Sequence, residues 1–166
     1  MKNTLIALVE DKPGVLTRVA SLFRRRNYNI DSLTVGHTEK PGISRMTIVV
    51  DSSQTDAGKV VENLCKLVNV IQVEDITGHP NVARDLALIK VNTPGGNARS
   101  EIMQLVDTFR ARVVDVGVDS LMIEVTGTED KVDSLADVLA PYGILEMVRT
   151  GRVAMARGAA GNGSGK

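Results

Sequence analysis

The residues with the clearest chemical potential lie in the segment Asp11-Lys12-Pro13-Gly14-Val15-Leu16, where an apolar strand turns into a helix. Asp11 is expected to cap that helix, and Pro13 suits a first helical turn. The N–H groups around Gly14, Val15 and Leu16 have no intrahelical partners, so together with the helix dipole they form an anion site suited to a carboxylate. Asp11 beside them could accept a hydrogen bond from an ammonium. The corner therefore suits a free α-amino acid, and the alternative is an ordinary capped helix start.

The rest of the chain offers little chemistry for catalysis. His37 and His79 are far apart and have no acidic or cysteine neighbours at metal-ligand spacing, which argues against a metal site. Cys65 sits beside Leu64 on a helix and is expected to act as a small apolar filler. Nucleotide-binding glycine motifs, HExxH and nucleophile elbows are missing from the sequence. We therefore expect no enzymatic activity from this chain.

Composition narrows the function further. The 166 residues contain 20 Lys and Arg against 20 Asp and Glu, which gives no basic footprint for nucleic acid. The basic cluster 24–26 falls at a predicted helix end, where it favours a solvated face. The four aromatic residues lie outside the predicted strands, which argues against an RNA-binding sheet. The sequence becomes apolar too early for a signal peptide, and it has no apolar run of membrane-spanning length. A single cysteine agrees with a reducing compartment. We therefore expect a cytoplasmic protein with no membrane partner.

Hydrophobic periodicity predicts the same order of elements twice. In the first half we expect strands at 3–9, 29–38, 44–51 and 70–76, with helices from 15 to 26 and from 57 to 68. In the second half we expect strands at 85–91, 112–118, 121–126 and 144–149, with helices around 102–109 and 132–139. Each half is a βαββαβ unit, so the predicted fold class is α+β with two tandem ferredoxin-like units. The expected boundaries are a first domain at 1–78, a linker at 79–83, a second domain at 84–157 and a disordered tail at 158–166.

The segment Asp11 to Leu16 resembles the signature corner of ACT domains, the small modules through which many metabolic enzymes sense amino acids. Three further segments, residues 27–35, 44–48 and 67–71, resemble the regulatory small subunit of acetolactate synthase, also called acetohydroxyacid synthase. The resemblance extends from residue 1 to about residue 157. It implies that the first unit is an ACT domain that binds an effector and forms a dimer.

The resemblance also implies a regulatory role. Members of this family associate with a catalytic large subunit that holds thiamine diphosphate, FAD and Mg²⁺, while the small subunit itself binds no cofactor. The large subunit condenses two pyruvates to acetolactate, or pyruvate with 2-oxobutyrate, in branched-chain amino-acid biosynthesis. The small subunit raises this activity and makes it sensitive to valine. The alternative is a stand-alone tandem ACT sensor that acts on another enzyme or on a transcription regulator.

The family finally implies a place for the effector, between the corner of one chain and the start of the second strand of another. Here that pairs the corner residues Asp11, Pro13, Gly14, Val15 and Leu16 with Asn29 and Ile30 of the partner subunit. Asp11 and Asn29 would accept from the ammonium, and apolar walls would come from Val9, Leu16 and Ile30. The family often has a neutral amide in place of Asp11, so leucine and isoleucine remain alternative effectors to valine.

Overall fold

The structure, a computed structural model, describes residues 1–158 and divides into two compact units. The first comprises Met1–Val82 with the described residues from Arg152 onward, and the second comprises Ala83–Gly151. The chain therefore passes between the units twice. Each unit is described separately below.

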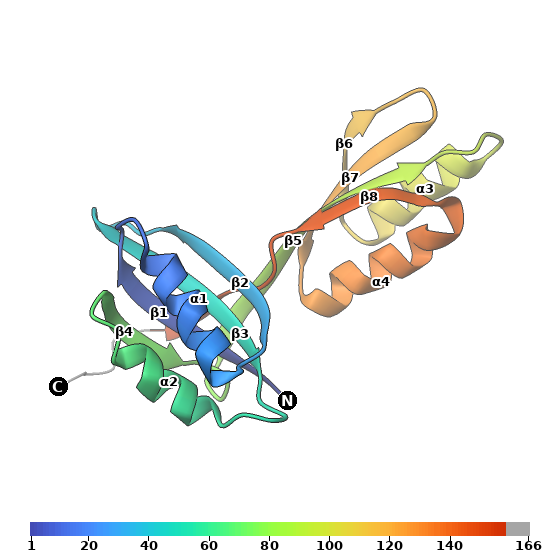
Figure 1. The fold of residues 1–166 in the computed structure, drawn as a ribbon. Helices are drawn as coiled ribbons and strands as arrows, with labels where there is room; N and C mark the ends of the chain where they lie inside the picture. The colour runs from blue at the N-terminus through green and yellow to red at the C-terminus, as the bar shows by residue number, and fades with distance from the viewer. Residues whose placement is uncertain (159–166) are drawn as a thin grey trace. The chain divides into compact units, whose positions relative to one another are not determined.

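The first unit is a four-stranded antiparallel sheet with two helices (Figure 1). Its elements are β1 (Lys2–Glu10), α1 (Val15–Arg26), β2 (Ile30–His37), β3 (Ile43–Asp51), α2 (Ala57–Cys65) and β4 (Val70–Asp75). The strand order is β2-β3-β1-β4, which leaves β2 and β4 as edges. Alternate residues of β1 and a helical stripe of α1 form one core, which includes Leu5, Ala7, Val19 and Phe23.

The second unit repeats this arrangement. Its elements are β5 (Asn81–Asn92), α3 (Ala98–Thr108), β6 (Arg112–Val116), β7 (Ser120–Gly127), α4 (Glu129–Leu139), a 3-10 turn η1 (Ala140–Tyr142) and β8 (Ile144–Arg149). The order β6-β7-β5-β8 matches that of the first unit element by element. A separate core forms around Ile89, Ile102, Ile123 and Leu135. The predicted fold class of two βαββαβ units is confirmed.

One strand was not predicted from the sequence. β9 (Val153–Ala156) pairs with β5, and Arg157 N donates to Pro80 O over 2.8 Å. Residues 152–157 were expected in the second domain, but they belong to the first unit. The expected linker 79–83 likewise contains the start of β5. The predicted tail lies outside the described residues except for Gly158.

The segment that begins at Arg152 lies against the face of the first sheet that the helices do not cover. Arg152 Nη1 donates to Thr4 Oγ1 over 2.9 Å, and Arg45 Nη2 donates to Ala154 O over 2.8 Å. Burial lowers the pKa of Arg45. Ile6 and Val49 point to this same face and are only 4 % and 1 % exposed. The central strands β1 and β3 are therefore buried on both faces, which a simple two-layer unit would not require.

The helix α2 is shorter than expected. It ends at Cys65 because the next two N–H groups turn back on the helix, from Lys66 to Asn63 O and from Leu67 to Leu64 O. Val68, expected on the apolar face, is 88 % exposed. Cys65 is exposed as well, so the prediction that it fills a core was wrong.

Candidate effector site at the first corner

The corner that follows β1 is held by backbone hydrogen bonds to two other parts of the first unit. Asp11 N donates to Gly42 O in the β2–β3 hairpin over 2.9 Å, and Glu10 N donates to Asn69 O over 2.9 Å. Lys12 N donates to Glu10 O over 3.0 Å. Because these bonds come from the hairpin and from the start of β4, the position of the corner depends on the whole sheet.

The helix start differs from the expectation. Gly14 is the N-cap of α1 with a φ of 84°, and no side chain caps the helix. The prediction that Asp11 caps it was wrong, and Pro13 precedes the N-cap instead of lying in the first turn. A left-handed φ is one that glycine adopts without the penalty that a Cβ brings. A Cβ built on Gly14 would meet nothing within 4 Å, so the backbone angle, and not crowding, favours glycine here.

The backbone donors at this helix start are largely free. Within residues 1–158 the N–H groups of Gly14, Leu16 and Thr17 have no hydrogen-bond partner. Val15 N makes only a long 3.4 Å bond to Lys12 O, and Arg18 N closes the first turn onto Gly14 O. The first turn contains no acidic residue. The positive end of α1 is thus open to an anion, with Thr17 as a donor that the sequence analysis did not include.

The corner also carries charged side chains, which contact one another. Asp11 Oδ2 lies 3.2 Å from His37 Nδ1 at the end of β2. Glu10 Oε2 lies 2.8 Å from Lys12 Nζ and accepts from Asn69 Nδ2 over 3.0 Å. Hydrogen bonding to Lys12 and then to Asn69 lowers the pKa of Glu10. Because Glu10 is engaged in this way, Asp11 is the carboxylate better placed to receive an ammonium.

A second polar contact fixes α1 beside the corner. Arg18 Nη1 donates to Asn69 Oδ1, so Asn69 links the helix to Glu10. His37, Asn69 and Arg18 were all missed by the sequence analysis. Arg18 lies one helical turn after Gly14, and that spacing was the only signal in the sequence that could have suggested it.

Asn29 and Ile30 lie at the other end of the same sheet. Ile30 pairs with Val50, as Asn3 at the start of β1 does, whereas His37 and Val9 both pair with Ser44. One chain therefore does not bring Asn29 to its own corner. The Asn29 side chain is exposed, and the backbone O of Asn29 accepts from Asp51 N over 3.4 Å.

The three residues expected to contact the apolar part of an effector differ in their exposure. Val9 is 1 % exposed and belongs to the core, so the prediction that it contacts a ligand was wrong. Leu16 is 46 % exposed beside the free N–H groups, and Ile30 is half-buried against the core. Leu16 and Ile30 remain available as apolar contacts.

Comparisons with known proteins identify the family. Residues 5–72 match a family model described as an AHAS small subunit-like ACT domain, and residues 84–158 match one described as the small subunit of acetolactate synthase. A probable acetolactate synthase small subunit from Archaeoglobus fulgidus is 54 % identical over 158 residues, which cover 95 % of this chain and 98 % of that protein. The chain belongs to the acetolactate synthase small-subunit family.

Two further comparisons agree with this family. The acetolactate synthase small subunit of Mycolicibacterium smegmatis is 49 % identical over 99 % of this chain and 96 % of its own length. The crystal structure of the acetolactate synthase small subunit from Thermotoga maritima superposes with a TM-score of 0.87 at 38 % identity, covering 95 % of this chain and 98 % of that chain. The resemblance inferred from the residues is confirmed. Family membership supports a regulatory subunit role beside a catalytic large subunit.

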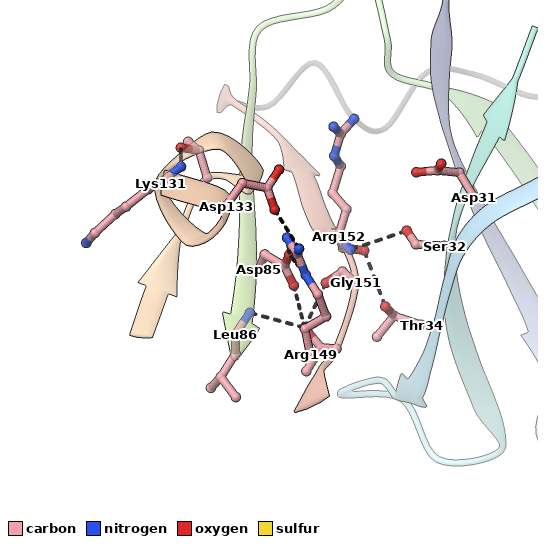
Figure 2. Close-up of polar contacts among 12 residues, drawn as sticks. Asp31, Ser32, Thr34, Asp85, Leu86, Lys131, Asp133, Arg149, Gly151 and Arg152 are labelled. Carbon is pink, nitrogen blue, oxygen red and sulfur yellow. Dashed lines mark hydrogen bonds and ion pairs between the residues drawn. The ribbon is translucent and has the colours of Figure 1, made fainter. Parts of the chain in front are cut away.

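In this family member the second unit contains its own polar cluster (Figure 2). Arg149 lies between two carboxylates: its Nε donates to Asp85 Oδ2 over 2.9 Å and its Nη1 to Asp133 Oδ1 over 2.6 Å. Asp85 is only 4 % exposed. Burial, the largest influence, lowers the pKa of Arg149, but the bonds to Asp133 and Asp85 outweigh it and leave the pKa raised. The cluster fixes β8 to β5 and explains how a carboxylate is tolerated in this sheet.

The described residues offer neither a metal site nor a second effector site. In residues 1–158 no group of three or more His, Cys, Asp or Glu side chains could hold a metal ion. The same part of the chain has no helix long and apolar enough to cross a membrane. The corner of the second unit contains a buried hydroxyl, Thr93 Oγ1, without a partner among the described residues. Solvent does not reach it, so it does not open a second effector site.

Proposed function

We propose that this chain activates the catalytic large subunit of acetolactate synthase and makes it subject to feedback inhibition by valine. The observation that supports effector binding is the set of free N–H groups at Gly14, Leu16 and Thr17, in the same corner of the chain as Asp11. A donor cluster next to an acceptor matches the carboxylate and ammonium of an α-amino acid. Family membership supports the choice of enzyme.

In this proposal the valine carboxylate accepts from the N–H groups at the start of α1. The ammonium donates to Asp11 and to Asn29 of the partner subunit. The isopropyl group contacts Leu16, which is 46 % exposed in the single chain, and Ile30 of the partner subunit. Leucine and isoleucine would make the same polar contacts and differ only at this apolar end.

The strand order supports a shared site. β2 is an edge strand of the first sheet. If two copies pair antiparallel through β2, the start of one β2 lies beside the end of the other. That end carries His37, whose side chain contacts Asp11. A two-fold dimer of this kind would bring Asn29 of the partner subunit toward the corner, which a single chain cannot do.

Control of the enzyme then follows from the dimer. A ligand that contacts two subunits favours one arrangement of the dimer, and only its difference in affinity between arrangements can act on the large subunit. A coupling free energy of about 1 to 3 kcal/mol would change activity or affinity roughly 5- to 150-fold. Thiamine diphosphate, FAD and Mg²⁺ are proposed for the large subunit, on the ground of family membership.

The test is acetolactate formation from pyruvate by the cognate large subunit, measured alone, with this chain, and with this chain plus valine. Activation that valine reverses is the expected result. Activation without a response to valine would overturn the effector and keep the partner. No activation would favour a stand-alone amino-acid sensor.

A further inference from the structure

A basic groove lies between the last turns of α1 and α2 in the first unit. Its volume is about 470 Å³, and it is lined by Leu22, Arg25, Arg26, Asn63, Lys66 and Leu67. Three of these six side chains are cations and none is acidic. A volume of this size accommodates several side chains of a partner or a small molecule.

The cations Arg25, Arg26 and Lys66 are not required to cap the C-termini of the helices. Two of the last carbonyls of α1, Arg24 O and Phe23 O, accept from the backbone N–H groups of Asn27 and Tyr28, and Asn27 adopts a left-handed φ of 54°. The helices α2, α3 and α4 end with no basic residue in their last turn. Helices of this fold therefore end without a basic residue in the last turn at three of the four positions described.

The cations are also unpaired. Throughout residues 1–158, neither Arg25, Arg26 nor Lys66 makes an ion pair. Concentrated unpaired charge of one sign attracts a ligand or surface of the opposite sign. The groove therefore favours carboxylate or phosphate groups.

Asn63 adds a different requirement. It is only 8 % exposed, and its Nδ2 donates to Tyr28 Oη over 3.1 Å and to Lys59 O over 2.7 Å. Its Oδ1 receives no hydrogen bond from the described residues, and Asn63 lines the groove, so this amide oxygen can accept from an occupant in a way that a bare anion cannot use. Leu22 and Leu67 add apolar surface. The occupant should combine negative charge with a hydrogen-bond donor and an apolar group.

We propose that this groove docks an acidic polypeptide segment of the catalytic large subunit. Asp or Glu side chains would pair with Arg25, Arg26 and Lys66, a backbone N–H would donate to Asn63 Oδ1, and an apolar side chain would contact the leucines. A polypeptide supplies all three groups, whereas an inorganic phosphate supplies only the charge. This inference rests on the proposed function and assigns it a contact surface.

The experiment compares variants by the concentration of this chain that gives half-maximal activation of the large subunit. The double variant Arg25→Gln/Arg26→Gln and the single variant Lys66→Gln should each raise that concentration about tenfold or more at low salt, with the maximal activation retained. The matched control is Arg24→Gln, since Arg24 is in the same helical turn but does not line the groove. It should change the concentration less than about twofold.

The outcomes separate this inference from the function itself. Failure of the wild-type chain to activate would overturn the proposed function. Wild-type activation with unchanged groove variants would overturn only the docking site, and so would an equal loss in Arg24→Gln, because that would show a general charge effect. Titration of tripolyphosphate into the free chain forms the other arm. Tight binding that Lys66→Gln abolishes, without any effect of this variant on activation, would assign the groove to a phosphate ligand instead.

Discussion

The Asp11 carboxylate lies 3.2 Å from the His37 imidazole, Oδ2 to Nδ1. This contact joins the corner after β1 to the end of the edge strand β2. The proposed ammonium acceptor therefore also contacts an imidazole nitrogen of the same chain. An amino acid that binds at the corner must share Asp11 with His37 or displace it.

Replacement of His37 should therefore strengthen effector binding. His37→Ala removes the competing imidazole, and since an exposed pair contributes about 0.2 to 1 kcal/mol, the dissociation constant for valine should fall roughly 1.5- to 5-fold. Calorimetric titration of valine measures this, with His79→Ala as the control for loss of a histidine elsewhere. A weaker affinity in His37→Ala would mean that His37 binds the effector itself.

Gly14→Asp should abolish the response to valine, because its carboxylate would occupy the anion site and repel the ligand. Gly14→Ala is the matched control, since both variants place a Cβ at a φ of 84° where nothing lies within 4 Å. Both should lose about 1 to 2 kcal/mol of stability from the left-handed backbone. Thermal unfolding measures the shared cost, and valine titration measures the difference. A folded Gly14→Asp complex that valine still inhibits would rule out this pocket.

Asn29→Ala should weaken the binding of valine and leave activation of the large subunit largely intact. The side chain is exposed, and the hydrogen bond that Asn29 receives from Asp51 N ends on its backbone O, which the substitution keeps. Asp31→Ala, an exposed change next to the same strand start, is the control. Loss of activation in Asn29→Ala would place this residue in the contact with the large subunit.

A mixing experiment tests whether the site is shared between subunits. A dimer of one Gly14→Asp chain and one Asn29→Ala chain has one site with both defects and one with neither. Mixed dimers should therefore recover binding at one of the two sites, although each variant alone binds poorly. Calorimetric stoichiometry after co-refolding detects this. If the site lay within one chain, mixing would restore nothing.

The stability of the second unit should depend on Arg149. Arg149→Met leaves the buried Asp85 carboxylate without its cation and should lower the free energy of unfolding by about 3 kcal/mol. The side chain of Asp133, the other partner of Arg149, is 51 % exposed. Asp133→Asn should therefore lower the free energy of unfolding by less than about 1 kcal/mol. Urea unfolding of the full chain compares them. Equal costs would contradict the assignment of Asp85 as the buried partner.

Local patterns predicted most of the fold. The helical spacing of Val15, Val19, Leu22 and Phe23 and the alternation of each strand are visible in a short window, and the structure contains these elements. β9 was missed because its partner strand lies about 70 residues earlier and Arg152 reaches Thr4 at a separation of 148 residues. No local pattern encodes such contacts.

At the candidate site, the sequence predicted the backbone geometry better than the side-chain contacts. The free donors at Gly14 and Leu16 follow from the helix start, which sequence specifies. Asp11 was assigned to the helix, but the hairpin accepts its N–H and His37 contacts its carboxylate. Val9 was assigned to the ligand, although its alternation with Leu5 and Ala7 already indicated the core. Contacts with the β2–β3 hairpin and with the end of β2 therefore decided the case of Asp11, which no local pattern shows.

The route of the chain has a genetic consequence. It leaves the first unit after Val82 and returns to it at Arg152, where Arg152 and Ala154 bond to the first sheet. A stop codon or frameshift late in the reading frame would therefore destabilise the first unit, although most of that unit is translated first. A fragment that ends at Val82 would lack the bonds that Arg152 and Ala154 make to Thr4 and Arg45. The smallest gene for an intact first unit would have to join the codons of two distant segments.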